Sequence, residues 1–286
     1  MQWDLCAGAM QGSPQSCYIA VMPEAELPDS FLSLIRAALP ISRAPLVIGL
    51  CGAQGSGKTT LVAALAARLA ADGIAAATLS LDDLYLTRAE RLELARDVHP
   101  LLATRGVPGT HDVALGLETI AALARGEAAL LPRFDKGKDD RAPVAGWPHA
   151  PSGTQVLLLE GWCVGARPQP AAALDEPVNT LEAEEDPDGM WRSYANDALA
   201  GPYRALFDRI DRLILLAAPV WSVVATWREQ QEAELRTVSP GAMTPQQVQH
   251  FIQHYERLTR WILAEMPARA DLVVRLDADR RPKDPC

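Results

Sequence analysis

The glycine-rich segment at residues 52–59, with the sequence GAQGSGKT, constrains the fold of this chain more than any other feature. It fits the pattern GxxxxGK[ST], in which glycines let the backbone curl until successive N–H groups point at a phosphate group. The apolar run at residues 46–50 predicts a buried strand before it, and the Ala- and Leu-rich stretch at residues 59–71 predicts a helix after it. In this setting the segment is expected to be the phosphate-binding loop of a nucleotide-binding α/β fold.

Two side chains of this loop add to what its backbone does. The ammonium group of Lys58 neutralises the phosphoryl group that is transferred, and the hydroxyl of Thr59 is a ligand for magnesium. We therefore expect the chain to bind ATP and Mg²⁺. The residues predicted to hold the nucleotide are Gly52, Ala53, Gln54, Gly55, Ser56, Gly57, Lys58, Thr59 and Thr60.

Short apolar runs recur along the chain and alternate with helical stretches. This pattern is typical of a parallel sheet that is covered by helices on both faces. The sequence therefore predicts a three-layer α/β fold with a five-stranded parallel sheet. The expected strands are residues 46–50, 77–81, 156–159, 213–217 and 272–276.

Carboxylates follow two of these predicted strands. Asp82 and Asp83 come directly after the second strand, and Glu160 ends the third. Because the carboxyl ends of parallel strands meet at one edge of a sheet, these acids are expected beside the phosphate loop. A carboxylate there can accept the proton of an attacking hydroxyl, and an acid in the position of Glu160 holds magnesium. The structural alternative for each is a helix cap or a solvated turn, and the shared edge favours the catalytic interpretation.

Two polar stretches interrupt the alternation of strands and helices. Residues 175–200 are acidic, and residues 227–235 are followed by the Ser-Pro-Gly-Ala break at 239–242, which is typical of a mobile flap. We therefore expect a helical lid at about residues 227–242. The domain division expected is an N-terminal extension with a short helix, residues 1–44, followed by a P-loop kinase domain, residues 45–286.

Composition excludes several classes of function. The net charge of −9 argues against nucleic-acid binding, because a phosphate backbone requires clustered Lys and Arg. The five cysteines include no CxxC pair, which argues against a zinc site or a disulfide framework. Without a leader segment or a run of about 18 apolar residues, the sequence predicts a cytoplasmic protein that does not bind a membrane. The expected partner is a small-molecule substrate, and the oligomeric state is not indicated.

Several motifs resemble one superfamily of kinases. The element Asp82-Asp83-Leu84-Tyr85, together with Glu160-Gly161, resembles the phosphoribulokinase, uridine kinase and pantothenate kinase superfamily. Within it, five segments are similar to plant-type D-glycerate 3-kinases and their ATP-binding fungal relatives. These segments are residues 80–87 (SLDDLYLT), 105–112 (RGVPGTHD), 132–136 (PRFDK) with 140–141 (DR), 160–162 (EGW) and 227–236 (WREQQEAELR).

The resemblance implies roles for individual residues. Asp82 matches the catalytic base, which acts with Lys58, and Glu160 matches the magnesium-associated acid. Arg228 and Arg236 fall on the lid helix over the phosphates. The residues expected to contact or wall the acceptor are Asp83, Tyr85, His111, Asp112, Arg133, Asp135, Lys136 and Arg141.

The activity implied is ATP-dependent phosphorylation of a small hydroxy acid, with D-glycerate as the first choice. A cluster of cations at residues 133–141 suits a carboxylate or a phosphate, although three interleaved aspartates weaken that interpretation. His111 either orients a hydroxyl or caps the helix that follows. Two alternatives stay open: a kinase of the superfamily for a nucleoside, pantothenate or a sugar phosphate, and a non-catalytic regulatory protein that binds ATP.

Overall fold

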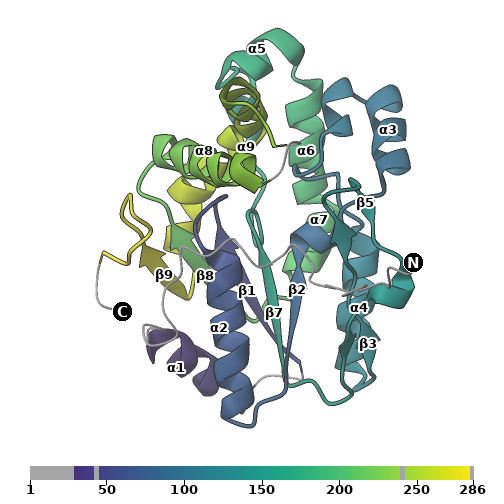
Figure 1. Cartoon of the computed structure of the whole chain (residues 1–286), viewed down its shortest axis with the longest axis vertical. Helices are drawn as coiled ribbons and strands as arrows, with labels where there is room; N and C mark the ends of the chain where they lie inside the picture. Colours follow the sequence, from purple (N-terminus) through teal and green to yellow (C-terminus); the bar gives the residue numbers. More distant parts are fainter. Residues whose placement is uncertain (1–28, 42–44, 239–241, 284–286) are drawn as a thin grey trace, which may run out of the picture.

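A five-stranded parallel sheet forms the centre of the molecule (Figure 1). The computed structural model describes residues 29–41, 45–238 and 242–283. The strand order is β2-β7-β1-β8-β9, and every neighbouring pair is parallel. The strands are β1 (Leu46–Gly52), β2 (Ala76–Ser80), β7 (Val156–Gly161), β8 (Arg212–Ala217) and β9 (Leu272–Arg275).

Helices cover both faces of this sheet. Every residue of β1 and β7 is buried, which explains why these strands are apolar throughout rather than alternating. On one face lie α1 (Asp29–Ala38), α2 (Lys58–Ala71) and the first part of α8 (Trp221–Val238). On the other lie α4 (Val113–Ala124), α6 (Met190–Ala200), α7 (Pro202–Phe207) and α9 (Pro245–Glu265).

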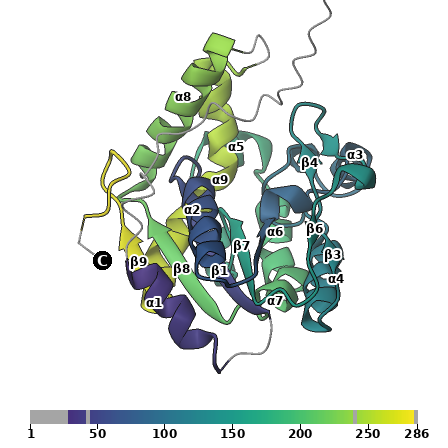
Figure 2. The same ribbon diagram turned by 60° about the horizontal axis from the view of Figure 1, so that its bottom comes forward.

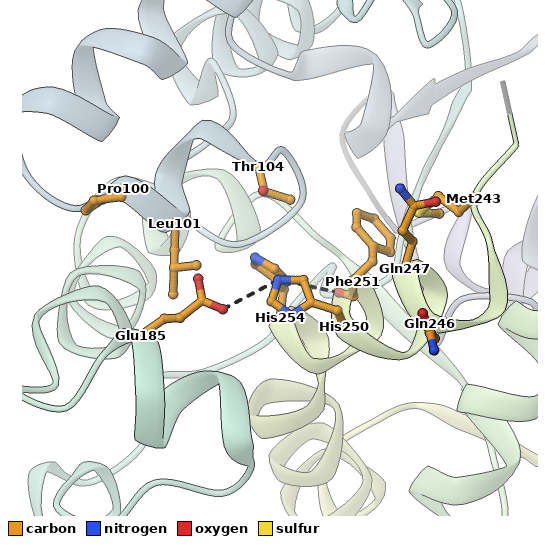
Figure 3. A pocket seen from close by; sticks show the side chains of 10 residues that line it. All are labelled: Pro100, Leu101, Thr104, Glu185, Met243, Gln246, Gln247, His250, Phe251 and His254. Carbon is orange, nitrogen blue, oxygen red and sulfur yellow. Dashed lines mark hydrogen bonds and ion pairs between the residues drawn. The ribbon is translucent and has the colours of Figure 1, made fainter.

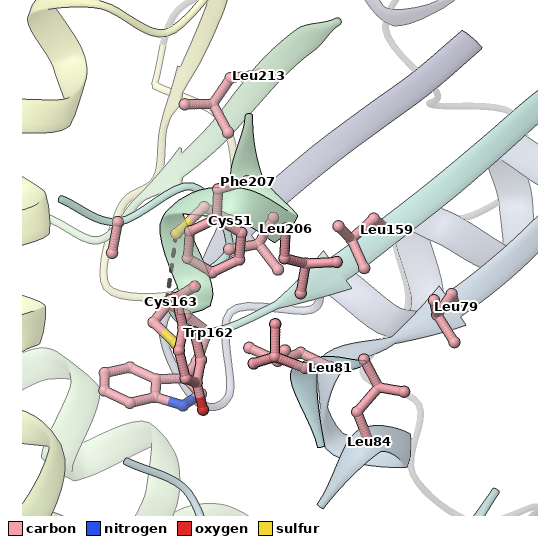
Figure 4. Close-up of a cluster of buried hydrophobic side chains, with 14 of the residues drawn as sticks. Cys51, Leu79, Leu81, Leu84, Leu159, Trp162, Cys163, Leu206, Phe207 and Leu213 are labelled. Carbon is pink, nitrogen blue, oxygen red and sulfur yellow. Dashed lines mark hydrogen bonds between the residues drawn. The ribbon is translucent and has the colours of Figure 1, made fainter. Parts of the chain in front are cut away.

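Successive side chains of each strand pack on opposite faces, as a period of two requires. Cys51 and Leu159 join the cluster beneath α4, α7 and α9, where the Cys51 thiol donates to the Trp162 carbonyl at 3.3 Å (Figure 4). Ile48 and Leu158 join the cluster beneath α1 and α2. Cys51 lies in β1 and Cys163 shortly follows β7, and both are buried, as a core role requires.

Shorter elements complete the layer beside β2. They are α3 (Arg88–Asp97), the single 3-10 turns η2 (Leu81–Leu84) and η3 (Pro100–Ala103), and the two-residue strands β3 (Ala129–Leu130), β4 (Phe134–Asp135), β5 (Asp140–Arg141) and β6 (His149–Ala150). The short helix α5 (Thr180–Glu185) packs against α9. Strands β4 and β5 pair as an antiparallel hairpin. Figure 2 shows α8 on one side of the upper sheet edge and α3 with β4 on the other.

The predicted five-stranded parallel sheet is confirmed, with small differences at element ends. The second strand stops at Ser80 rather than at Leu81, because Leu81 turns into η2 and is fully buried there. The short helix predicted within residues 1–44 is α1, and its apolar side packs into the core. The acidic stretch at 175–200 contains α5 and α6.

The predicted lid region, about residues 227–242, overlaps the second part of α8, which begins earlier, at Trp221. Trp227 is completely buried, so the first half of this helix belongs to the core. Residues 239–241 of the predicted break lie outside the described residues. The following helix, α9, begins with a capping box between Thr244 and Gln247. None of the helices in the described part of the chain combines the length and the apolar character of a membrane span.

Candidate active site

The glycine-rich loop joins the end of β1 to the start of α2. Gly55 and Gly57 have φ angles of 75° and 85°, in the left-handed region that favours glycine. Gly57 is the N-cap of α2 and offers its helix no side-chain cap, so the first N–H groups are free to bind an anion. Lys58, Thr59 and Thr60 form the first turn of α2, while Gly52 ends β1. In Figure 1, α8 lies across the end of α2 at which this loop enters.

Glu160 lies at the sheet edge beside this loop. It stands in register with Leu50 of β1 and Ser80 of β2, so three strand ends meet around it. The carboxyl group is 4% exposed, and no described residue donates a hydrogen bond to its Oε2. Burial raises the pKa of Glu160, and the nearby charge of Lys58 opposes that shift. A buried carboxylate oxygen without a partner fits a magnesium ligand.

Asp82 faces the same edge from the turn η2. Its carboxylate accepts a hydrogen bond from the Tyr85 hydroxyl at 2.7 Å and another from Lys136 Nζ at 2.7 Å. Burial by itself would raise the pKa of Asp82, but the charges of Lys136 and Lys58 outweigh it and hold the pKa well below its usual range. The charge of Asp82 in turn raises the pKa of Lys136. The pair is therefore an ionised carboxylate and an ammonium group next to the phosphate loop.

Asp83 makes different contacts, although it is the next residue. One carboxylate oxygen accepts from the Phe134 backbone N–H at 3.0 Å, and the other accepts from the Arg133 guanidinium at 3.1 Å. Burial raises the pKa of Asp83. These contacts attach the turn η2 to strand β4, and β4 leads directly to Lys136. Asp83 thus fixes the segment that brings Lys136 to Asp82.

An aromatic wall continues from Asp82. The ring of Tyr85 stacks on His111 at 4.7 Å and meets Phe134 edge-on at 5.2 Å. His111 Nδ1 is hydrogen-bonded to the Tyr203 hydroxyl, while its Nε2 is buried and has no partner within the described residues. Burial lowers the pKa of His111 to about 3, so the imidazole is neutral at physiological pH. His111 is therefore an uncharged polar group in this wall.

Three further residues predicted to wall the acceptor, Asp112, Asp135 and Arg141, make contacts that hold the protein's own segments together. Asp112 is the N-cap of α4 and accepts from the Leu115 N–H at 3.0 Å, so Asp112, not His111, caps this helix. Its other oxygen accepts from Arg141 at 2.9 Å. Asp135 accepts from the backbone N–H groups of residues 137 and 138 and closes the turn of the β4–β5 hairpin. These groups shape the wall of the site.

Two further residues near this wall, Arg105 and Tyr255, were not among the site residues predicted from the sequence. The Arg105 guanidinium is ion-paired with Asp139 and lies 5.6 Å from the centre of the Phe134 ring. The Tyr255 hydroxyl donates to the Arg105 carbonyl at 3.1 Å. The position of Arg105 at the start of the motif at 105–112 was a usable signal. Tyr255 belongs to the apolar stripe of α9, and nothing in that stripe marks its hydroxyl.

The two arginines predicted on the lid are paired within the α8–α9 region. Arg228 is ion-paired with Glu232 and lies 5.4 Å from the centre of the Phe251 ring. Arg236 is ion-paired with Glu229 and donates to the Met243 carbonyl at 2.6 Å. Their role over the phosphates stays a prediction. Limited proteolysis after these two arginines, with and without ATP, would test it, because a lid is protected only when the nucleotide is bound.

A separate cleft of about 600 Å³ opens between η3, α5 and the start of α9 (Figure 3). A pair of His250 and Glu185, 3.5 Å apart, crosses it. It shares Phe251 and Met243 with the surroundings of the two arginines of α8. None of its lining residues was predicted to bind a ligand. It borders the lid region and contains no residue of the phosphate loop.

Comparisons with known proteins agree with this geometry. The family described as phosphoribulokinase/uridine kinase matches residues 47–167. A protein described as the uncharacterized kinase mug58 of Schizosaccharomyces pombe is 34% identical over 236 residues, which cover 79% of this chain and 84% of that protein. The chloroplastic D-glycerate 3-kinase of Arabidopsis thaliana is 33% identical over 257 residues, which cover 83% of this chain and 54% of the plant protein.

A solved structure has the same fold. The D-glycerate 3-kinase from Cryptococcus neoformans superposes with a TM-score of 0.75 at 27% identity. The superposition covers 90% of this chain and 97% of the fungal one. The similarity therefore extends over most of the fold.

Proposed function

The chain belongs to the phosphoribulokinase/uridine kinase family, and we propose that this ATP-dependent kinase phosphorylates a small hydroxy acid, with D-glycerate as the first choice. The observation that carries the proposal is the pair of Asp82 and Lys136 beside the phosphate loop. A nucleotide sensor has no need of a carboxylate on the acceptor side of its phosphate loop, whereas a kinase has a use for one there.

In the proposed reaction, an acceptor hydroxyl oxygen attacks the γ-phosphorus of ATP. The bond to the β,γ-bridging oxygen breaks, ADP leaves, and the hydroxyl proton passes to Asp82. Lys58 neutralises the charge on the transferred group from the side of the loop. Magnesium held by Thr59 and Glu160 would supply further neutralisation at the phosphates. The ammonium group of Lys136 keeps Asp82 ionised.

Arg105 supports an acceptor that carries a carboxylate. The other two guanidinium groups of this wall are each paired with a carboxylate that no other described arginine contacts, Arg133 with Asp83 and Arg141 with Asp112. Arg105 is paired with Asp139, but that carboxylate is shared with the buried Arg91 at 2.9 Å. A guanidinium presents several N–H donors in a planar fork, so Arg105 keeps donors for the carboxylate of a hydroxy acid.

A screen of acceptors tests the proposal. ATP consumption should be faster with D-glycerate than with uridine, pantothenate or ribulose 5-phosphate.

In the variant Arg105→Gln, the KM for glycerate should rise about tenfold or more, because a charged hydrogen bond contributes roughly 1.5–3 kcal/mol. The KM for ATP should stay the same. The control is Arg96→Gln, since Arg96 is 70% exposed and is paired with its neighbour Asp97.

Three outcomes would separate the alternatives. Turnover of a nucleoside with none of glycerate would contradict the acceptor and leave the family assignment intact. An unchanged KM for glycerate in the Arg105 variant would contradict the role of that residue alone. Binding of ATP without consumption, with every acceptor of the screen, would favour a regulatory protein.

A further inference from the structure

The turn that follows β9 is held by its own contacts. The Asp277 carboxylate accepts from the backbone N–H groups of Asp279 at 2.8 Å and Arg281 at 2.9 Å. Leu276 and Pro282 form an antiparallel bridge at its base. Within this turn Arg280 has a φ angle of 67°, in the left-handed region that disfavours a residue with a Cβ. Arginine is an unusual residue at this position, which glycine would occupy with less strain.

The Arg280 side chain reaches the phosphate loop. Its Nε donates to the Gly55 carbonyl at 2.6 Å, across 225 positions of sequence. Its terminal nitrogen donates to the Gln230 side chain at 2.8 Å, and its guanidinium lies 5.3 Å from the centre of the Trp227 ring. Both Gln230 and Trp227 belong to α8. One guanidinium therefore contacts the phosphate loop and α8 together.

A second set of contacts holds the same three segments together. The Trp227 indole N–H donates to the Ala278 carbonyl of the turn at 2.7 Å. Gly55 packs so closely on Trp227 that an added Cβ would lie 2.7 Å from the Cβ of the tryptophan. The loop, the helix and the turn are thus in mutual contact.

The hydrogen bond from Arg280 to the Gly55 carbonyl restricts the orientation of one peptide plane of the loop. The carbonyl of residue 55 and the N–H of Ser56 belong to one rigid peptide, and this N–H donates to the Ala53 carbonyl at 3.2 Å. Arg280 and Ala53 therefore hold the peptide from its two sides. Glycine on either side of Ser56 gives this part of the loop unusual freedom to rotate. A charge-assisted hydrogen bond limits that freedom before the nucleotide arrives, and preorganisation of this kind strengthens binding.

We propose that Arg280 is a positioning residue, which holds the phosphate loop in its nucleotide-binding form and couples the loop to α8. It acts through the backbone of Gly55 and not on the acceptor. The proposal rests on ATP use by this kinase and does not depend on the identity of the acceptor.

The variant Arg280→Gly tests the proposal, because glycine removes the guanidinium without straining the left-handed backbone. Binding of MgATP is measured by titration calorimetry and by the rise in melting temperature at saturating MgATP. The matched control is Arg281→Ala, which removes one exposed positive charge from the same turn. The variant Arg280→Lys keeps the charge but has no planar fork that reaches Gly55 and Gln230 together.

We expect the affinity for MgATP to fall about tenfold in Arg280→Gly, to fall less in Arg280→Lys and to stay unchanged in Arg281→Ala. The melting temperature without nucleotide should be similar in all four proteins, and the KM of the acceptor should not change. Equal affinities in Arg280→Gly and Arg281→Ala would overturn the proposal. A large fall in melting temperature in Arg280→Gly, with unchanged affinity for MgATP, would do the same, since it would mark a purely structural role. Calorimetry needs no acceptor, so a wrong acceptor assignment leaves this test intact.

Discussion

The variant Lys58→Ala is expected to lose turnover and most of the thermal protection that ATP gives. Lys58 opens α2 at the phosphate loop, and its charge reaches the buried groups of the site, since it opposes the rise in the pKa of Glu160 and helps to lower the pKa of Asp82. Without this ammonium group, nothing in the loop neutralises the transferred phosphoryl group. Kinetics with saturating ATP and a melting curve with and without ATP would measure the two losses.

The size of the thermal effect can be stated in advance. At a hundredfold excess of ATP over its Kd, binding stabilises the wild-type protein by about 2.7 kcal/mol, and a hundredfold loss of affinity would reduce this to about 0.4 kcal/mol. The control is Lys138→Ala, because the Lys138 side chain is 77% exposed and pairs with Asp135 at 3.5 Å. ATP protection of Lys58→Ala equal to that of the control would contradict the assignment of the phosphate loop.

The second large effect is expected for Asp82→Asn. Turnover should fall by about a hundredfold or more, the usual contribution of a general base, while ATP binding stays nearly intact. The variant keeps the size of the side chain and an oxygen for the Tyr85 hydroxyl, but it loses the charge that pairs with Lys136. Because the pKa of Asp82 is held well below its usual range, turnover of the wild type should show no acid limb from this group between about pH 5 and pH 7.

Asp83, the residue next to Asp82, provides the matched comparison. Asp83→Asn should reduce turnover less and melting temperature more, because Asp83 holds Phe134 and Arg133 of the adjoining segment. Steady-state kinetics and melting curves of both variants would separate the roles. An equal loss of turnover at both positions, or a greater loss at Asp83, would mean that the base had been assigned to the wrong carboxylate.

Much of this site could be predicted from the sequence because its signals are local. Strands buried on both faces must be apolar along their whole length, so β1 and β7 are visible as short apolar runs. A loop that curls around phosphate requires glycine, so the residues between β1 and α2 are recognisable as well. Since parallel strands end at a common edge, the positions of Asp82 and Glu160 beside that loop followed from the strands alone.

The partners of these groups were decided by the tertiary structure. Asp82 and Asp83 are adjacent and chemically identical, yet one meets Lys136 and the other anchors β4, because η2 points their side chains in different directions. Lys136 is 54 positions from Asp82, and Arg280 is 225 positions from Gly55. Periodicity and turn chemistry act over a few residues, whereas charges and hydrogen bonds act through space. The sequence by itself therefore determined the sheet, the loop and the edge at which chemistry takes place, and only the folded chain decided which side chains meet there.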